Sequence, residues 1–170
     1  IIYNYYLKKL YKNIIYFQKK LYLHKFIKIK LYQMLLNINL NPTETYKSLD
    51  NLCGRTYGWL KRIKTNNFGS HKYYLKDISK NKFELNLYDY HNTIGTSFDL
   101  RDKGLVFFFR HNNNEYAEAC LYRKITIQSN DNTFVVQTDK NLYTFEILNS
   151  KKHLNFIKEF FNFKNKTITQ

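Results

Sequence analysis

Residues 133–148 read TFVVQTDKNLYTFEIL, and they give the clearest indication of the fold. Two runs rich in β-branched and aromatic residues, 133–138 and 142–148, flank a turn-forming Asp-Lys-Asn at 139–141. The pattern predicts two antiparallel strands joined by a short turn.

The sequence before this hairpin repeats the pattern. Further apolar runs lie at residues 83–91, 94–100, 105–110 and 116–128. Polar turn compositions separate them, namely DKG at 102–104, HNNN at 111–114 and SNDN at 129–132. The second half of the chain is therefore predicted to be an antiparallel meander of five or six strands.

A helix is predicted after the meander, from Ser150 to Phe163. Serine is a residue type that caps helices, and apolar residues follow Ser150 at helical spacing. The predicted apolar face consists of Leu154, Ile157, Phe160 and Phe161. A strand meander closed by one helix resembles pleckstrin-homology-like folds in architecture, and that likeness implies no ligand.

The first half of the chain is predicted to be helical and rich in loops. Apolar residues at three-and-four spacing predict a helix over residues 5–36, with lysines on another face. Such a helix can lie on a membrane, along RNA or on an ordinary protein surface, and the pattern does not separate these three. Pro42 predicts an extended loop over residues 39–48. A short helix capped by Ser70 is predicted over residues 69–82.

The formal net charge of the 170 residues is +15, and it is unevenly distributed. Residues 1–83 hold 17 basic and 3 acidic residues, a net of +14, whereas residues 84–170 have a net of +1. So basic a half-chain indicates a polyanion, a membrane surface or an acidic protein as its partner. The alternative is a lysine-coated face that only meets solvent.

Several functional classes lack support in the sequence. Two cysteines, Cys53 and Cys120, are too few for a disulfide framework or a four-cysteine zinc site. No nucleophile elbow, phosphate-binding loop or His–Glu metal motif occurs. Every 18-residue window contains a charge, so no transmembrane span is expected. We therefore expect neither an enzyme nor a resident metal or cofactor.

Residues 51–69, NLCGRTYGWLKRIKTNNFG, carry the functional signal. Their glycines allow a close backbone approach, and an arginine between glycines can grip a phosphate with its planar fork. The two arginines of residues 1–83, Arg55 and Arg62, both lie here, although chance placement in a surface loop is the alternative. Trp59 stands among cations, where a ring can stack on a base, but core packing is the role expected for it.

These residues resemble the universal small-subunit ribosomal protein S-fourteen family. The family motif reads N-x-C-x-x-T-G-R-x-x-G-x-x-R, followed by F-G-L-S-R and L-R-E-x-A. The matching positions are Asn51, Cys53, Gly54, Arg55, Gly58, Lys61 or Arg62, Phe68, Gly69, Lys72, Leu75, Lys76, Asp77 and Ser79. The match covers about residues 31–85. Three residues between Cys and Gly-Arg are missing, and about four extra ones precede Phe68, so the turn is reshaped.

The resemblance implies a structural constituent of the small-subunit head, of the zinc-free form, buried among rRNA and neighbouring head proteins. The implied RNA-binding residues are Gly54, Arg55, Gly58, Lys61, Arg62, Lys64, Phe68, Gly69, His71, Lys72 and Lys76. Codon-biased usage of Tyr, Phe, Ile, Lys and Asn favours a mitochondrial ribosome in the matrix, with a plastid as second choice. The alternatives are a free nucleic-acid-binding regulator and a membrane-surface basic protein.

The sequence as a whole predicts an α+β protein with two regions. Residues 1–85 form the basic, helical and loop-rich region that would bind rRNA. Residues 86–170 form a β-rich extension, an antiparallel meander ending in a helix. Because the extension is nearly neutral, we expect it to contact other ribosomal proteins more than RNA.

Overall fold

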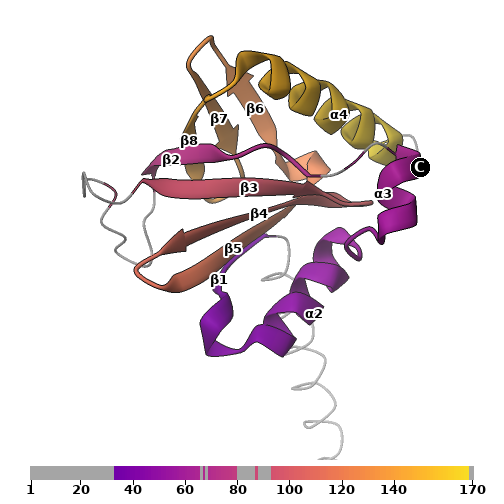
Figure 1. Ribbon diagram of the computed structural model, residues 1–170. Coiled ribbons are helices and arrows are strands. Elements are labelled where there is room, and N and C mark those ends of the chain that lie inside the picture. Colours follow the sequence, from indigo (N-terminus) through magenta and orange to yellow (C-terminus); the bar gives the residue numbers. More distant parts are fainter. Residues whose placement is uncertain (1–32, 66, 68, 80–86, 88–92, 169–170) are drawn as a thin grey trace, which may run out of the picture. The chain divides into compact units, whose positions relative to one another are not determined.

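The computed structural model describes residues 33–65, 67, 69–79, 87 and 93–168, and these form one eight-stranded antiparallel sheet with helices packed on it (Figure 1). The strand order is β1-β5-β4-β3-β2-β8-β7-β6. The elements are β1 Gln33–Asn37, η1 Ile38–Leu40, α2 Pro42–Cys53, α3 Trp59–Thr65, β2 Tyr73–Ile78, β3 Ile94–Leu100, β4 Gly104–His111, β5 Asn114–Leu121, η2 Tyr122–Lys124, β6 Thr126–Ser129, β7 Thr133–Gln137, β8 Leu142–Glu146 and α4 Ser150–Ile168. The predicted α+β class and the β meander with its C-terminal helix are confirmed.

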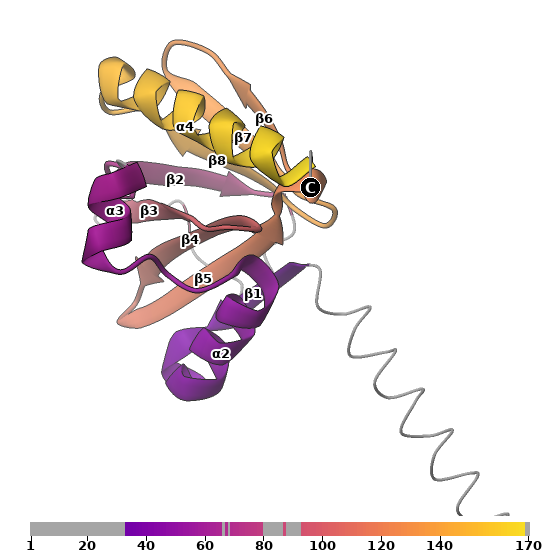
Figure 2. The same cartoon turned by 90° about the vertical axis from the view of Figure 1, so that its right-hand side faces the viewer.

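The two faces of the sheet are covered by different helices, α4 on one and α2 on the other (Figures 1 and 2). Alternation along β4 explains this, because Phe107 and Phe109 join the α4 side while Val106 joins the α2 side. The α2 side is lined by small residues of β5, Ala117 and Ala119, against which Leu49 packs.

The α4 side holds the larger, aromatic core. Phe98 is central to it, with ring centroids 5.0 Å from Phe145, 5.3 Å from Phe156 and 5.6 Å from Phe134. These rings come from β3, β8, α4 and β7, so this one cluster ties the centre of the sheet and its β8–β7 side to the helix. Aromatic pairs at these separations add to the free energy gained by burial.

The apolar face predicted for the last helix is partly wrong. α4 buries His153, Phe156, Phe160 and Phe163, at three-and-four spacing, whereas Leu154 is 67% exposed and Phe161 43% exposed. The buried histidine is polar, so a stripe drawn from apolar residues alone is rotated away from the true one. Asn149 is the N-cap in place of Ser150, because its Oδ1 accepts from Lys152 N at 2.9 Å.

The predicted loop at residues 39–48 is instead the start of a helix. Asn41 caps α2, its Oδ1 accepting from Glu44 N at 3.3 Å. Pro42 occupies the first helical position, where the missing N–H has no intrahelical acceptor to lose. The proline therefore starts this helix and does not stop one.

The helix predicted over residues 69–82 is wrong, because residues 73–78 form a strand, β2, and residues 80–82 lie outside the described residues. Tyr73 and Leu75 are buried on the aromatic side, and β2 pairs with β3 on one edge and β8 on the other. Ser70 is not a helix cap, because its Oγ accepts from Phe98 N at 2.9 Å and so joins this segment to β3. Pairing on both edges outweighs a local helical preference. Of the helix predicted over residues 5–36, residues 33–36 belong to β1, and residues 5–32 lie outside the described residues.

The chain divides into compact units between Tyr32 and Gln33. The predicted boundary at residue 85 does not coincide with this division. β1 and β2, from the region predicted to bind rRNA, lie in the same sheet as the strands of the predicted extension. The glycine–arginine segment is therefore built into the β-rich body.

Candidate nucleic-acid interface

The Gly54–Gly58 segment joins α2 to α3 and lies against the β3–β4 connection. Gly54 has φ +90°, and a side chain there would approach Cβ of Asp102 to 3.4 Å. Its N–H donates to Asp50 O at 2.9 Å, while Lys103 N donates to Cys53 O at 3.0 Å. Burial raises the pKa of the Cys53 thiol to about 12, so this motif residue contributes packing and no reactive thiolate.

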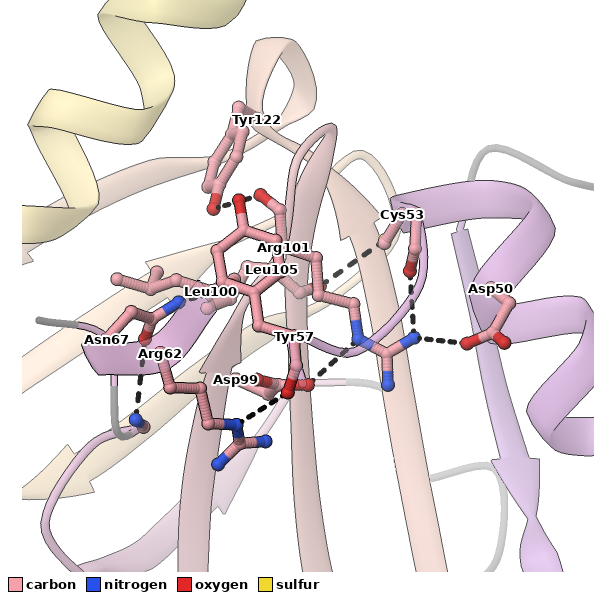
Figure 3. Close-up of polar contacts among 12 residues, drawn as sticks. Asp50, Cys53, Tyr57, Arg62, Asn67, Asp99, Leu100, Arg101, Leu105 and Tyr122 are labelled. Atoms are coloured by element: carbon pink, nitrogen blue, oxygen red, sulfur yellow. Dashed lines mark hydrogen bonds and ion pairs between the residues drawn. The ribbon is translucent and has the colours of Figure 1, made fainter. Parts of the chain in front are cut away.

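Arg101 anchors the turn from the inside (Figure 3). Its guanidinium is 1% exposed, and its Nε donates to Asp99 Oδ2 at 2.9 Å. Its Nη1 donates to Asp50 Oδ1 at 2.9 Å and to Gly54 O at 3.1 Å. The Tyr122 hydroxyl donates to Arg101 O at 2.9 Å. One buried cation thus joins α2, the glycine turn and β3.

Sequence reasoning missed Arg101. It lies in the predicted extension, far along the chain from the motif that it holds. The only signal was the neighbouring pair of aspartates, Asp99 and Asp102, which is also an ordinary surface composition. Only the folded chain brings the guanidinium to within hydrogen-bonding distance of Gly54 O.

Asp102 fixes the outer side of the same turn. It accepts from the Tyr57 hydroxyl at 2.5 Å and from Lys61 Nζ at 3.0 and 3.1 Å. Burial alone would raise the pKa of Asp102, but the hydrogen bonds from Tyr57 and Lys61, with the charges of Lys61 and Lys103, outweigh burial and lower it. Lys61 also lies 3.9 Å from the Tyr57 ring centroid. Through these contacts, Lys61 attaches α3 to Asp102 and to the Tyr57 ring.

α3 turns its side chains outward, and none of its residues is buried. Trp59 is 70% exposed, Leu60 65% and Ile63 59%, so the core packing predicted for Trp59 is wrong. Lys64 and Arg55 are also exposed and make no ion pair with any described residue. An exposed indole ring and two exposed cations without an ion pair to any described residue therefore lie close together along the chain.

Arg62 is half-buried beneath this surface. Its Nε donates to Tyr57 O at 2.8 Å, which fixes the start of α3 to the turn (Figure 3). Asn67 Nδ2 donates to Leu100 O at 2.7 Å and closes the far end of the segment. The six predicted site residues from Gly54 to Lys64 therefore share one locality, which residues 99–103 support. We call Arg55, Trp59 and Lys64 the α3 surface.

The remaining predicted site residues lie elsewhere. Gly69 has φ +83° beside Phe98 O, and Lys72 lies over Gly95 on the sheet. Lys76 is paired with Glu146 at 2.6 Å. Phe68 lies outside the described residues.

His71 sits on the α4 side of the sheet. Its ring centroid is 4.1 Å from that of Tyr73, and neither ring nitrogen has a hydrogen-bond partner among the described residues. Burial, then the charges of His153 and Lys152, lowers the pKa of His71. A neutral, enclosed imidazole of this kind gives little attraction for a phosphate.

Comparisons with known proteins add no relative: no family model, no curated protein and no solved structure matches the chain. The likenesses to the ribosomal family and to pleckstrin-homology-like folds therefore remain expectations from the sequence. Within the described ranges, no helix has the length and apolar character needed to cross a membrane. The same ranges hold no cluster of three or more His, Cys, Asp or Glu side chains placed to bind a metal.

Proposed function

We propose that this protein binds RNA, as a structural constituent of the small-subunit head of a mitochondrial ribosome. The observation that carries the proposal is the α3 surface, where a 70% exposed indole lies within five residues of the exposed cations Arg55 and Lys64 in the chain. An exposed tryptophan among cations without ion-pair partners in the described chain suits a ligand that offers both rings and phosphates. The net charge of +14 on residues 1–83 supports a polyanionic partner.

The anchoring network suits this role energetically. Arg101 and Asp102 fix the glycine turn from two sides, so little ordering is left to be done when a ligand arrives. Arg55 and Lys64 then neutralise phosphates and release counterions, while Trp59 stacks on an unpaired base. Binding of this type depends steeply on salt and reads the shape of the RNA more than its sequence.

The β-rich part has a separate surface suited to proteins. Leu154 and Phe161 lie seven residues apart on α4, which places them on one outward stripe. Apolar side chains at positions i and i+7 of one helix are among the anchors by which a helix packs into the groove of another protein. We assign this stripe to a neighbouring protein of the subunit.

Trp59 supplies a direct test, because it is the only tryptophan in the chain. We expect its fluorescence to be quenched when single-stranded RNA is titrated into the full chain. Trp59→Ala should weaken RNA binding by about 1–3 kcal/mol, the range for loss of one base stack, and Leu60→Ala should not. Unchanged fluorescence at RNA concentrations that saturate binding would contradict the role of the α3 surface.

The ribosomal setting needs its own measurement. An organellar extract is fractionated on sucrose gradients at moderate and high salt, and the chain is followed by blotting. Co-sedimentation with the small subunit at high salt supports an integral constituent. Release at high salt favours a free RNA-binding regulator, and flotation with anionic liposomes favours a membrane-surface protein.

A further inference from the structure

A second basic surface lies on the sheet face opposite α4, where β3 begins and β4 ends. A recess of about 710 Å³ opens there, between Lys72 and the turn that joins β4 to β5. Its polar and basic lining comprises Lys72, Thr93, Arg110, His111, Asn112 and Asn113. Four of these six side chains come from residues 110–113 of the predicted extension. The α3 surface contributes no residue to it.

Gly95 makes room for the lysine. A Cβ placed on Gly95 would lie 2.7 Å from Lys72 Cε and 3.3 Å from its Nζ. The aliphatic stem of Lys72 therefore lies across the bare backbone of β3. This contact carries the ammonium group to the rim of the recess and restricts its freedom to move.

The turn at the other side of the recess is held in place. Asn112 and Asn113 have φ of 46° and 61°, the left-handed conformation of a two-residue hairpin turn. Asn39 clamps it, because its Nδ2 donates to Asn113 O at 3.3 Å and its Oδ1 accepts from Glu115 N at 2.8 Å. These hydrogen bonds fix the backbone that carries the Asn112 and Asn113 side chains.

The recess is lined by basic and polar side chains and by no acidic side chain of the described residues. Among the described residues, no aspartate or glutamate lines it, and neither Lys72 nor Arg110 forms an ion pair. The acid nearest in register is Glu115, directly across from Arg110 on β5, and the two make no ion pair. The recess combines an ammonium, a guanidinium and amide donors, which are the groups that bind phosphate oxygens.

We propose that this recess binds a backbone phosphate of RNA, as a contact separate from the α3 surface. The inference rests on the proposed RNA-binding function and assigns RNA to part of the extension predicted to face proteins. The ammonium of Lys72 supplies a point charge, and the Arg110 guanidinium supplies two parallel N–H donors. Gly95 keeps the floor open, since any larger residue would displace the lysine.

The test measures binding of a fluorescein-labelled single-stranded RNA to the full chain by anisotropy at several salt concentrations. The variants are Lys72→Ala, Arg110→Ala and Gly95→Val, with Lys151→Ala as the matched control. Lys151 is an exposed lysine on α4, on the opposite side of the sheet. Thermal unfolding of each variant comes first, so that only variants with the wild-type midpoint are compared.

Each recess variant should weaken binding and flatten the plot of log affinity against log salt, by about one unit of slope for each phosphate that is no longer neutralised. Lys151→Ala should keep the wild-type slope. Wild-type slopes in Lys72→Ala and Arg110→Ala, with weaker binding by Trp59→Ala, would overturn the recess proposal and leave the proposed function intact.

Two further probes identify the source of the phosphate. Inorganic phosphate and vesicles containing phosphatidylserine compete against the labelled RNA in separate titrations. Competition by millimolar phosphate that disappears in Arg110→Ala supports the recess as a phosphate site. Vesicle binding that needs Lys72 and Arg110, in a protein that does not bind RNA, would overturn both proposals.

Discussion

Arg101 and Arg55 flank the same turn and have opposite surroundings. Arg101 is 1% exposed, interacts with two carboxylates and donates to Gly54 O. Arg55, the next residue after Gly54, is exposed and makes no ion pair with a described residue. Both are arginines at one turn, yet one is a fixed part of the core and the other is available to a ligand.

A binding group and the group that positions it can therefore come from distant parts of a chain. A buried guanidinium with its partners satisfied cannot also grip a phosphate without losing them. An exposed one can, because it gives up only water. Three measurements test this contrast between the buried anchor and the α3 surface, and a fourth compares it with the α4 side of the sheet.

Removal of the buried Arg101 guanidinium should cause the largest loss of stability. Arg101→Ala leaves the carboxylates of Asp99 and Asp50 without their buried cation, and truncating one partner of such a network costs about 3–5 kcal/mol. We expect a loss of this size in the free energy of unfolding measured with urea. Arg101→Lys, which keeps the charge without the fork, should lie between Arg101→Ala and the wild type. A wild-type midpoint in Arg101→Ala would show that the network adds nothing to stability.

Alanine substitutions at the two glycines of the motif, Gly54 and Gly58, should differ in their cost to the free energy of unfolding. Gly54 has φ +90° and ψ 164°, a region that residues with a side chain avoid, so Gly54→Ala should cost about 1–3 kcal/mol. A Cβ on Gly58 would meet no atom within 4 Å, and its φ is not left-handed, so Gly58→Ala should stay within about 0.5 kcal/mol. Urea titrations of both variants decide this, and equal losses would contradict it.

Arg55→Ala should leave folding alone and weaken RNA binding. Because its side chain is exposed, we expect the free energy of unfolding to change by no more than about 0.5 kcal/mol. The salt slope of RNA binding should fall by about one unit. Incorporation into the small subunit should fall more than with Lys12→Ala, a substitution outside the described residues. Equal incorporation of the two variants would contradict a role for Arg55 in binding rRNA.

A pH titration should act on the α4 side of the sheet. Burial lowers the pKa of His153, and burial followed by nearby charge lowers that of His71, so both rings are neutral in the folded chain. The unfolded state then binds protons first, and stability should fall as pH drops below about 6.5. The slope should not exceed about 1.4 kcal/mol per pH unit for each ring.

His153 offers the control for this titration. Its Nδ1 lies 3.0 Å from the Tyr73 hydroxyl and its Nε2 lies 2.8 Å from Ser129 Oγ, so His153→Gln keeps a polar group in that position. The variant should show a shallower decline between about pH 6.5 and 5. A decline as steep as that of the wild type would assign the effect to other groups.

Some features of this protein follow from the sequence alone. Strands β3, β4, β7 and β8 are predicted from short β-branched and aromatic runs between polar turns, because alternation and turn chemistry are local properties. The concentration of positive charge in the first half is also a property of the sequence. The glycine–arginine turn can be located for the same reason.

The remaining features arise from contacts that form only in the folded chain. β2 is a strand because β3 and β8 supply partners on both edges, and no local pattern reports those partners. Trp59 is outside because α3 is held by polar contacts with Asp102 and Tyr57 O and buries none of its own residues. Arg101 is structural because folding brings three acceptors around it. Burial and pairing depend on residues far apart in the chain, so local periodicity cannot assign them.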